Sequence, residues 1–410
     1  MTKRVVLVRH GESEANAGEL WQGATSSPLT EAGRDQAELL GARLQHRKFD
    51  MVASSDLERA LHTARLAGYP VPLVDPGWRE GYLGEWEGRP TEWVVDHCGD
   101  DLMRLQYDYD LPMGRTGETP RQVAERSWKS LTSLLEKIDE GGSGLVFAHG
   151  GVIDMILWRI TRLTPGRRRS GFLSNGSLCE LSFKGDKASI LRYNDATHLR
   201  PIAPWSEATR TEGGTVIDLI RHGVTHANLD GRVQGRLDSD LHPNGKRQAR
   251  RLSSWVGDFD EIYSSPLARA SSTAEIAFGQ APRLADDLME ISFGEWEGNR
   301  WQDLAAQGRL DEYQKGHDVR RGRTGETWAE AQARIEGFIN HLARTHPGKR
   351  VAATSHGGVI RAYAARVLGL PYEKIGLLGH LQNTSVTQIA IAEDGFPTLA
   401  TYNLAPHLED

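Results

Sequence analysis

Short apolar runs alternate with amphipathic stretches along the whole chain. Residues 3–9 (KRVVLVR) and 215–221 (TVIDLIR) are brief, apolar and rich in β-branched side chains, which is typical of buried strands. Two further pairs of segments have the same character, and each precedes a stretch with helical spacing. These pairs are 49–55 with 259–265, and 144–151 with 350–358.

Residues 30–45 show the helical pattern clearly. Ala37, Leu40 and Leu44 fall on one face, and Thr30 is placed to cap the first turn. Strands that alternate with such helices predict an α/β domain, with a mostly parallel sheet covered by helices on both faces. Ligands of such sheets bind at the carboxyl ends of strands, where a helix begins.

The chain repeats itself. Six blocks recur in the same order, and the offset between copies drifts only from 212 residues, at Arg9 and Arg221, to 207, at His149 and His356. Such a repeat indicates a tandem duplication of one domain. The blocks are the Arg-His strand end, "QG", "SSDLERA" with "SSPLARA", "REGYLGEWEG" with "MEISFGEWEG", "GRTGET" and "HGGVI".

The repeat also sets the domain organisation that we expect. One domain spans 1–196 and the second spans 215–410. Between them, 197–214 holds two prolines, two glycines and no periodic pattern, which predicts a linker.

Composition narrows the function classes. The chain has 410 residues and a formal net charge of −6, so no basic field attracts nucleic acid or an anionic membrane surface. No apolar stretch approaches the roughly 18–20 residues of a membrane span, and Lys3 and Arg4 precede too few apolar residues for a signal peptide. Cys98 and Cys179 share no metal-type spacing. We expect a reduced, soluble, cytoplasmic protein.

Both copies place the same polar side chains at strand ends and helix starts. Two arginines, two histidines, an asparagine and one carboxylate form a cationic pocket with a single acid. Arginine forks and a Gly-Gly helix start both suit phosphoryl oxygens; a histidine there can attack phosphorus while the acid protonates a departing alcohol. The residues are Arg9, His10, Asn16, Arg59, Glu80 and His149, and Arg221, His222, Asn228, Arg269, Glu290 and His356.

Other readings of these residues are weaker. Core histidines would not end a strand in His-Gly four times. Zinc bound by His10, Glu80 and His149 would be repelled by the two arginines, and the chain has no His-Glu-x-x-His motif. Glu85 and Glu87 of "GEWEG" are spaced like turn residues, so we interpret them as solvated or capping side chains.

Five motifs of the first copy, "VRHGESEAN", "LTEAGRDQA", "SSDLERA", "REGYLGEWEG" and "AHGG", resemble the histidine phosphatase superfamily, also called the phosphoglycerate mutase-like family. The second copy carries counterparts in the same order, so the resemblance covers nearly the whole chain. It implies two tandem three-layer α/β/α domains, a phosphohistidine intermediate and no metal or other cofactor.

The resemblance also assigns roles by position. His10 and His222 become nucleophiles, and Glu80 and Glu290 become proton donors. The phosphate pocket is expected from Arg9, Arg59 and His149, and from Arg221, Arg269 and His356. Further substrate contacts are expected from Ser13, Asn16, Gln22, Gly23 and Gly150, and from Thr225, Asn228, Gln234, Gly235 and Gly357.

Departures from the family pattern leave the chemistry complete. Val224 replaces the usual acidic residue that Glu12 supplies in the first copy, Asp56 replaces the proline seen at Pro266, and His242 replaces Thr30. We therefore predict a metal-independent phosphatase of small-molecule phosphomonoesters with two active sites. A mutase stays open as an alternative, although "GEWEG" and "GRTGET" resemble the phosphatase branch more closely. A chain with one catalytic copy and one binding or regulatory copy also stays open as an alternative.

The copies agree least between the acid and the "GET" block. Residues 89–116 hold three basic and six acidic side chains, a net of −3, whereas 299–324 hold six basic and four acidic, a net of +2. In this family the segment lies over the pocket mouth. We therefore expect the two sites to prefer different substrates, with the more anionic one in the second site.

Overall fold

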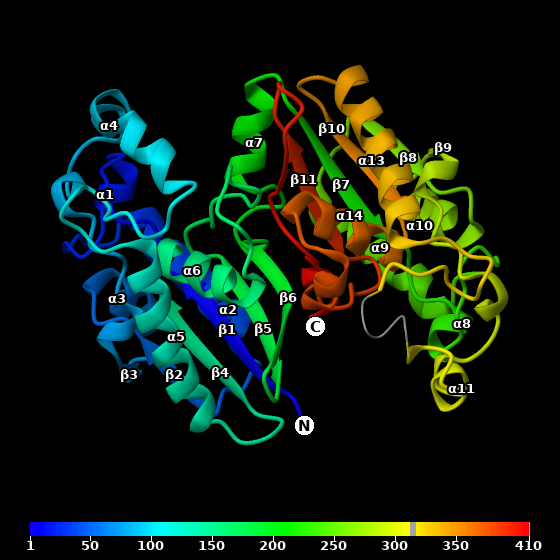
Figure 1. Ribbon diagram of the computed structural model, residues 1–410, viewed down its shortest axis with the longest axis horizontal. Coiled ribbons are helices and arrows are strands. Elements are labelled where there is room, and N and C mark those ends of the chain that lie inside the picture. The colour runs from blue at the N-terminus through cyan, green and yellow to red at the C-terminus, as the bar shows by residue number, and fades with distance from the viewer. Residues whose placement is uncertain (312–316, 410) are drawn as a thin grey trace. The chain divides into compact units, whose positions relative to one another are not determined.

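The computed structural model describes residues 1–311 and 317–409. The chain divides into two compact units, residues 1–168 with 172–200 and residues 169–171 with 201–410. Each unit is built on one six-stranded sheet flanked by helices (Figure 1). Within the described residues, no helix is both long and apolar enough to span a membrane.

The first sheet has the order β3-β2-β4-β1-β5-β6. Three of its five pairings, β3–β2, β2–β4 and β4–β1, are parallel, while β1–β5 and β5–β6 are antiparallel. Its strands are β1 (Lys3–Arg9), β2 (Met51–Ser54), β3 (Leu73–Val74), β4 (Ser143–Ala148), β5 (Leu178–Lys184) and β6 (Lys187–Asp195). Its helices are α1 (Glu14–Ala17), α2 (Glu31–Leu44), α3 (Glu58–Leu66), α4 (Thr91–Leu105), α5 (Pro120–Glu136) and α6 (Gly150–Thr161), with 3-10 turns at Pro76–Trp78 and Gly84–Trp86.

The second sheet, of order β12-β11-β7-β10-β8-β9, has the same arrangement: parallel pairings join β7, β10, β8 and β9, and antiparallel ones add β11 and β12. Its strands are β7 (Thr215–Arg221), β8 (Glu261–Ser264), β9 (Arg283–Leu284), β10 (Arg350–Ser355), β11 (Val386–Ile391) and β12 (Pro397–Leu399). Its helices are α7 (Pro204–Thr211), α8 (His226–Leu229), α9 (Pro243–Val256), α10 (Ala268–Phe278), α11 (Trp301–Ala306), α13 (Trp328–Thr345) and α14 (Gly357–Leu368). Further 3-10 turns lie at Asp286–Leu288, Gly294–Trp296, Tyr372–Leu377 and Pro406–Leu408.

The predicted α/β class with a mostly parallel sheet is thus confirmed in both domains. In the first, Leu40 and Leu44 of α2 and Ala64 of α3 pack on one face of the sheet against Val6 and Phe147. Helices α5 and α6 pack together, and α6 also contacts β1. The three layers follow from these contacts, because each helix buries its apolar stripe on the sheet.

Strand register brings the predicted site together. In the parallel pair β1–β4, Arg9 lies opposite Ala148, so His10 and His149 both follow the carboxyl end of a buried strand. The predicted cap is confirmed as well, because the Thr30 hydroxyl accepts the Gly33 N–H at the start of α2.

The expected linker differs from the prediction in one respect. Instead of an irregular segment throughout, it contains helix α7, whose Pro204 occupies the first turn. The helix packs on β7 and β11 and buries Ser206 and Thr209. Tertiary packing of this kind stabilises short helices that sequence periodicity does not announce.

Candidate active site

The loop after β1 is held against the start of α2 by two glycines. A Cβ added to Gly11 would lie 2.3 Å from the Gly33 carbonyl oxygen, and one added to Gly33 would lie 1.9 Å from that of Glu12. Only glycine permits this approach of two backbones. The contact fixes the position of His10, which immediately precedes Gly11.

The hydrogen bonds of His10 define its tautomer. Its Nδ1 lies 2.7 Å from the Gly11 carbonyl oxygen, which can only accept, so Nδ1 carries the hydrogen. The other nitrogen, Nε2, keeps its lone pair and accepts from Arg59 Nε at 3.2 Å. A buried imidazole whose Nε2 carries no proton can act as a nucleophile at neutral pH.

A second histidine stands beside the first. The His10 and His149 ring centroids are 5.1 Å apart, and His149 Nε2 lies 2.9 Å from the Ser55 hydroxyl. His149 Nδ1 is buried and has no hydrogen-bond partner. That nitrogen is therefore available to a ligand.

Two arginines surround the histidines, and carbonyl groups fix their forks. Arg59 donates from Nη1 to Thr25 O at 2.8 Å and from Nη2 to Gly23 O at 2.7 Å. Arg9 donates from Nη1 to Leu173 O, while its buried Nε has no partner. Neither guanidinium is neutralised by a carboxylate contact among the described residues, so both positive charges face the site.

Glu80 lies at the N-terminus of α6. Its Oε2 accepts the Gly151 N–H at 2.9 Å, and its Oε1 accepts the N–H of Gly81 at 3.0 Å. A Cβ on Gly151 would lie 2.6 Å from Glu80 Oε1. The second glycine of the "HGG" block therefore leaves space for the carboxylate.

The "GRTGET" block, to which sequence reasoning gave no role, supports Glu80. Glu118 of this block pairs with Arg126 at 2.8 Å and accepts the Tyr82 N–H. Arg126 in turn donates to the carbonyl oxygens of Arg79 and Glu80. The Glu118–Arg126 ion pair therefore fixes the backbone of residues 79–82, which carry Glu80.

Three of the residues expected to contact substrate bond to one another. Ser13 caps α1 and donates to Gln22 Oε1 at 2.8 Å, and Asn16 completes the capping box. Asn175, which sequence reasoning missed, donates to the His10 carbonyl oxygen at 3.2 Å and to Asn16 Oδ1 at 3.0 Å. Gly23, also expected to contact substrate, contributes its carbonyl oxygen to Arg59. The signal for Asn175 was its recurrence as Asn383, at the offset of 208 shared by "GRTGET".

Glu87 does more than the capping expected of it. Its carboxylate accepts the N–H groups of Ala24 at 2.9 Å and Thr25 at 3.2 Å. It thereby holds the loop whose carbonyl oxygens fix Arg59. Glu85 agrees with expectation, since its side chain is exposed.

Burial and charge act together on the ionisable groups. Desolvation, followed by the nearby guanidinium charges of Arg59 and Arg9, holds the pKa of His10 well below its usual range. The pKa of His149 is lowered by the same causes. Burial also lowers the pKa of Arg59 to about 10. Both histidines are therefore neutral near pH 7.

The second domain repeats this geometry. His222 Nδ1 lies 2.7 Å from Gly223 O, the His222 and His356 centroids are 5.1 Å apart, and Glu290 accepts the Gly358 N–H at 3.1 Å. Several other contacts have counterparts. Arg221 donates to Leu381 O, Arg269 to Gly235 O and Leu237 O, Thr225 to Gln234 and Asn228, and Asn383 to His222 O; Gly357 lies over Arg221 as Gly150 lies over Arg9.

The surroundings of the second arginine differ from those of the first, because Arg269 Nη1 lies 3.9 Å from Asp238 Oδ1. Arg269 Nε has no hydrogen-bond partner, whereas Arg59 Nε reaches His10. The pKa of His222 and that of His356 are nevertheless held well below the usual range, by burial first and then by Arg269.

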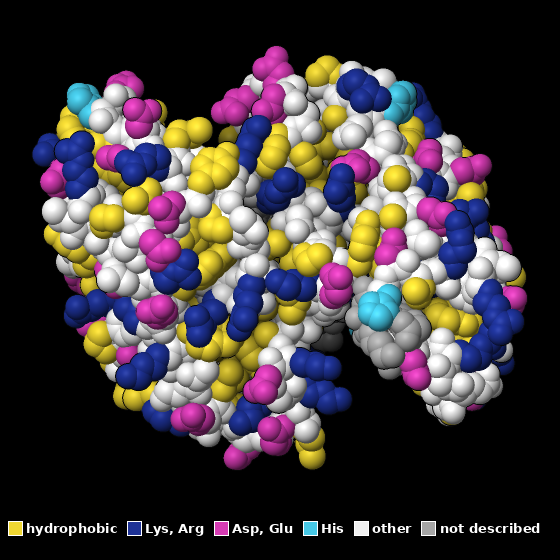
Figure 2. All heavy atoms as spheres, in the orientation of Figure 1, with side chains coloured by type: hydrophobic (Ala, Val, Ile, Leu, Met, Phe, Trp, Pro, Cys, Tyr) yellow, Lys and Arg dark blue, Asp and Glu magenta, His cyan; other side chains and the backbone are white. Residues whose placement is uncertain are grey.

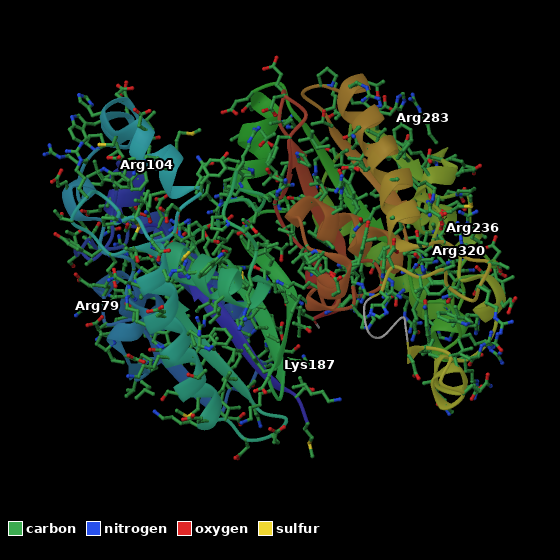
Figure 3. All side chains as sticks on the ribbon, in the orientation of Figure 1. Arg79, Arg104, Lys187, Arg236, Arg283 and Arg320 are labelled. Atoms are coloured by element: carbon green, nitrogen blue, oxygen red, sulfur yellow. The ribbon has the colours of Figure 1, made fainter. Side chains whose placement is uncertain are left out.

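Some charged side chains of the segments beside the sites are paired within their own domain. Arg104 and Arg320 are labelled in Figure 3. Arg104 lies 3.9 Å from Asp101, and Arg320 pairs with Glu330. Glu312 and Lys315, two of the charges counted in the second segment, lie outside the described residues. On the visible face of each domain, basic and acidic side chains are interspersed (Figure 2). Within the described residues, no cluster of three His, Cys, Asp or Glu side chains is arranged to hold a metal ion.

Parts of this chain are similar in sequence to known phosphatases and to a probable phosphoglycerate mutase. The chain is 36% identical over 185 residues to adenosylcobalamin/alpha-ribazole phosphatase of Salmonella typhimurium, covering 43% of this chain and 91% of that protein. It is 30% identical over 201 residues to the metal-independent phosphoserine phosphatase of Arabidopsis thaliana (46% and 82%). It is 32% identical over 186 residues to the probable phosphoglycerate mutase GpmB of Yersinia enterocolitica (44% and 85%).

The family model of the histidine phosphatase superfamily (branch 1) matches two regions, residues 5–196 and 217–404. These two matches agree with the repeat seen in the sequence and with the two sheets of the structure. The chain therefore belongs to the histidine phosphatase superfamily and is a phosphoric monoester hydrolase.

Proposed function

We propose that each domain is an independent, metal-independent phosphatase of small-molecule phosphomonoesters, with a phosphohistidine intermediate on His10 in the first and on His222 in the second. The observation that carries the proposal is the hydrogen bond from histidine Nδ1 to the following glycine carbonyl, 2.7 Å in both domains. It aims a lone pair on Nε2 into a pocket of two guanidinium groups.

In the first step, His10 Nε2 attacks phosphorus in line and the bond from phosphorus to the ester oxygen breaks. Glu80 gives its proton to that oxygen, so the alcohol leaves neutral. Arg9, Arg59 and His149 Nδ1 stabilise the three equatorial oxygens, with the N–H of Gly150, which begins α6. One such donor is worth about 10²–10³ in rate.

In the second step, water attacks the phosphohistidine. Glu80, now a carboxylate, accepts a proton from the water, and the phosphorus–nitrogen bond breaks. Inorganic phosphate leaves and Nε2 regains its lone pair. Residues Arg221, His222, Arg269, Glu290 and His356 play the same parts in the second domain.

Two alternatives have distinct consequences. A mutase returns the phosphoryl group to a substrate hydroxyl and releases no inorganic phosphate. A chain with one regulatory copy loses all turnover when the nucleophile of its catalytic copy is removed. The complete set of side chains in both domains favours two hydrolytic sites.

The test measures phosphate release from 4-nitrophenyl phosphate, with and without a chelator, in four variants. His10→Ala and His222→Ala should each retain the turnover of the other site, and the double variant should have none. His46→Ala, an exposed histidine of the first domain, is the control and should behave as the unchanged protein. Loss of all activity in one single variant, or loss in chelator that a divalent ion restores, would refute the proposal.

A further inference from the structure

Helices α6 and α14 begin with the same residues, "GGVI", and then diverge in charge. Asp154 in α6 occupies the position of Arg361 in α14. Each lies one helical turn after the first glycine, on the same face. That face lies against the phosphate arginine, since a Cβ on Gly357 would be 3.2 Å from Arg221 Nε.

Arg361 is a half-buried cation without a carboxylate partner among the described residues. Its Nη1 donates to His380 Nδ1 at 3.4 Å, its guanidinium lies 5.9 Å from the centre of the Trp328 ring, and its buried Nε has no partner. The positive charge of Arg361 is the main cause that lowers the pKa of His380 to about 4. His380 is therefore neutral and leaves the Arg361 charge uncompensated.

The same place in the first domain is neutralised. Asp154 pairs with Arg168 at 2.7 Å, and Arg168 lies 4.3 Å from the centre of the Phe172 ring. Phe172 occupies the position of His380, because each stands one residue before the leucine whose carbonyl oxygen accepts from Arg9 or Arg221. An acid–arginine pair thus replaces the lone arginine of the second domain.

A further substitution adds to this difference. Arg321 occupies the position of Met113, directly before the "GRTGET" block. The Arg321 side chain is fully buried, with its guanidinium 4.1 Å from the centre of the Trp328 ring that Arg361 also faces. In the first domain Met113 offers only an apolar thioether beside Gly81. Two guanidinium groups, those of Arg321 and Arg361, therefore face one aromatic ring in the second domain.

We propose that the site around His222 takes a phosphomonoester whose alcohol part carries a second anionic group, a carboxylate or a phosphate, which Arg361 binds. The inference rests on the proposed function of that site. A half-buried guanidinium with an unused N–H gains most from an anion that arrives with the substrate. At the equivalent place near His10 the described residues present the Asp154–Arg168 ion pair, so that site takes esters whose alcohol part is neutral.

The experiment uses the full chain with His10→Ala, so that only the second site turns over. It compares kcat/KM for 3-phosphoglycerate, glycerol 3-phosphate and glycerol 1,3-bisphosphate, which share a carbon skeleton and differ in the second group. We expect Arg361→Gln to lower kcat/KM for at least one of the two anionic esters about tenfold or more, as for a lost hydrogen bond to a charged group. Glycerol 3-phosphate should change by less than about threefold.

Arg361→Lys keeps the charge and should restore part of the preference. Arg366→Gln, on the same helix with an exposed side chain paired to Glu336, is the control and should leave all three rates unchanged. The two anionic esters distinguish a carboxylate site from a phosphate site.

Equal losses for all three esters after Arg361→Gln, or no loss for either anionic ester, would overturn the inference and leave Arg361 a packing residue. Turnover of 4-nitrophenyl phosphate by the same protein separates this outcome from a failure of the proposed function. If that ester is hydrolysed with unchanged preference among the others, only the specificity inference fails. If it is not hydrolysed, the second site is not a phosphatase.

Discussion

Replacing Gly151 by alanine should displace the proton donor without harming the fold. The added Cβ would lie 2.6 Å from Glu80 Oε1, and contacts of real Cβ atoms begin at 3.0 Å, so the carboxylate must withdraw by 0.4 Å or more. The group that yields is the end of a side chain rather than backbone. Alanine has the higher helix propensity by about 1 kcal/mol, so α6 itself is not weakened.

The magnitude follows from the part that the acid plays. General acid assistance is worth about 10²–10⁴ in rate, and a misplacement of about 1 Å costs on the order of 10². In the His222→Ala chain, Gly151→Ala should therefore lower kcat for an alkyl ester such as glycerol 3-phosphate by about 10-fold to 10²-fold. 4-Nitrophenyl phosphate, whose leaving group scarcely needs a proton, should lose less than about threefold.

The assay is phosphate release from both esters, with thermal unfolding measured alongside. Gly99→Ala is the matched control, because Gly99 is also a helical glycine and a Cβ there meets nothing within 4 Å. An alkyl esterase rate within about twofold of the parent, or equal losses for the two esters, would refute the placement of Glu80 as proton donor.

Glu80→Gln should reproduce this leaving-group signature more strongly, by about 10²–10⁴ for alkyl esters, and equal losses for aryl and alkyl esters would exclude the acid role. Glu118→Gln leaves Arg126 without its charged partner, so it should lower the free energy of unfolding in urea by about 1–3 kcal/mol and should also lower kcat. The control is Glu125→Gln, on the exposed side of α5, which should change neither quantity. The folded-state pKa of buried His10 and His149 lies below their unfolded value, so the unfolded chain binds more protons as pH falls below about 6.5. The free energy of unfolding should therefore decrease below that pH, by up to about 1.4 kcal/mol per pH unit for each histidine. A free energy of unfolding, measured in urea, that stays constant from pH 7 to pH 5 would contradict the burial of both histidines as neutral rings.

Much of the site was predictable because it lies where regular elements end. His10 and His149 each follow an apolar strand, and parallel pairing of those strands brings them to one edge of the sheet. The repeat supplied the second evidence, since chance does not place the same polar residues twice in one order. The sequence predicted that Gly151 belongs to a helix start that suits an anion, but it did not show that this glycine leaves space for Glu80.

The remainder depended on contacts between distant irregular segments. Asn175 reaches the His10 carbonyl group from a stretch without periodicity, and Glu87 binds a loop 62 to 64 residues away. Helix α7 forms because it packs on a sheet, a cause that a local pattern does not contain. The exchange of Asp154 for Arg361 is plain in the sequence once the copies are aligned. What this exchange does to the charge of each site could be seen only once the structure showed where Arg168 and His380 lie.

Two histidines of one chain should each carry a phosphoryl group during turnover. The most direct measurement mixes the protein with 4-nitrophenyl phosphate, stops it in alkaline denaturant and locates phosphoryl groups on its peptides by mass spectrometry. The account predicts adducts that are stable in alkali and labile in acid, on His10 and on His222, with each single alanine variant losing only its own. An acid-stable adduct, or adducts confined to one domain in the unchanged protein, would contradict it.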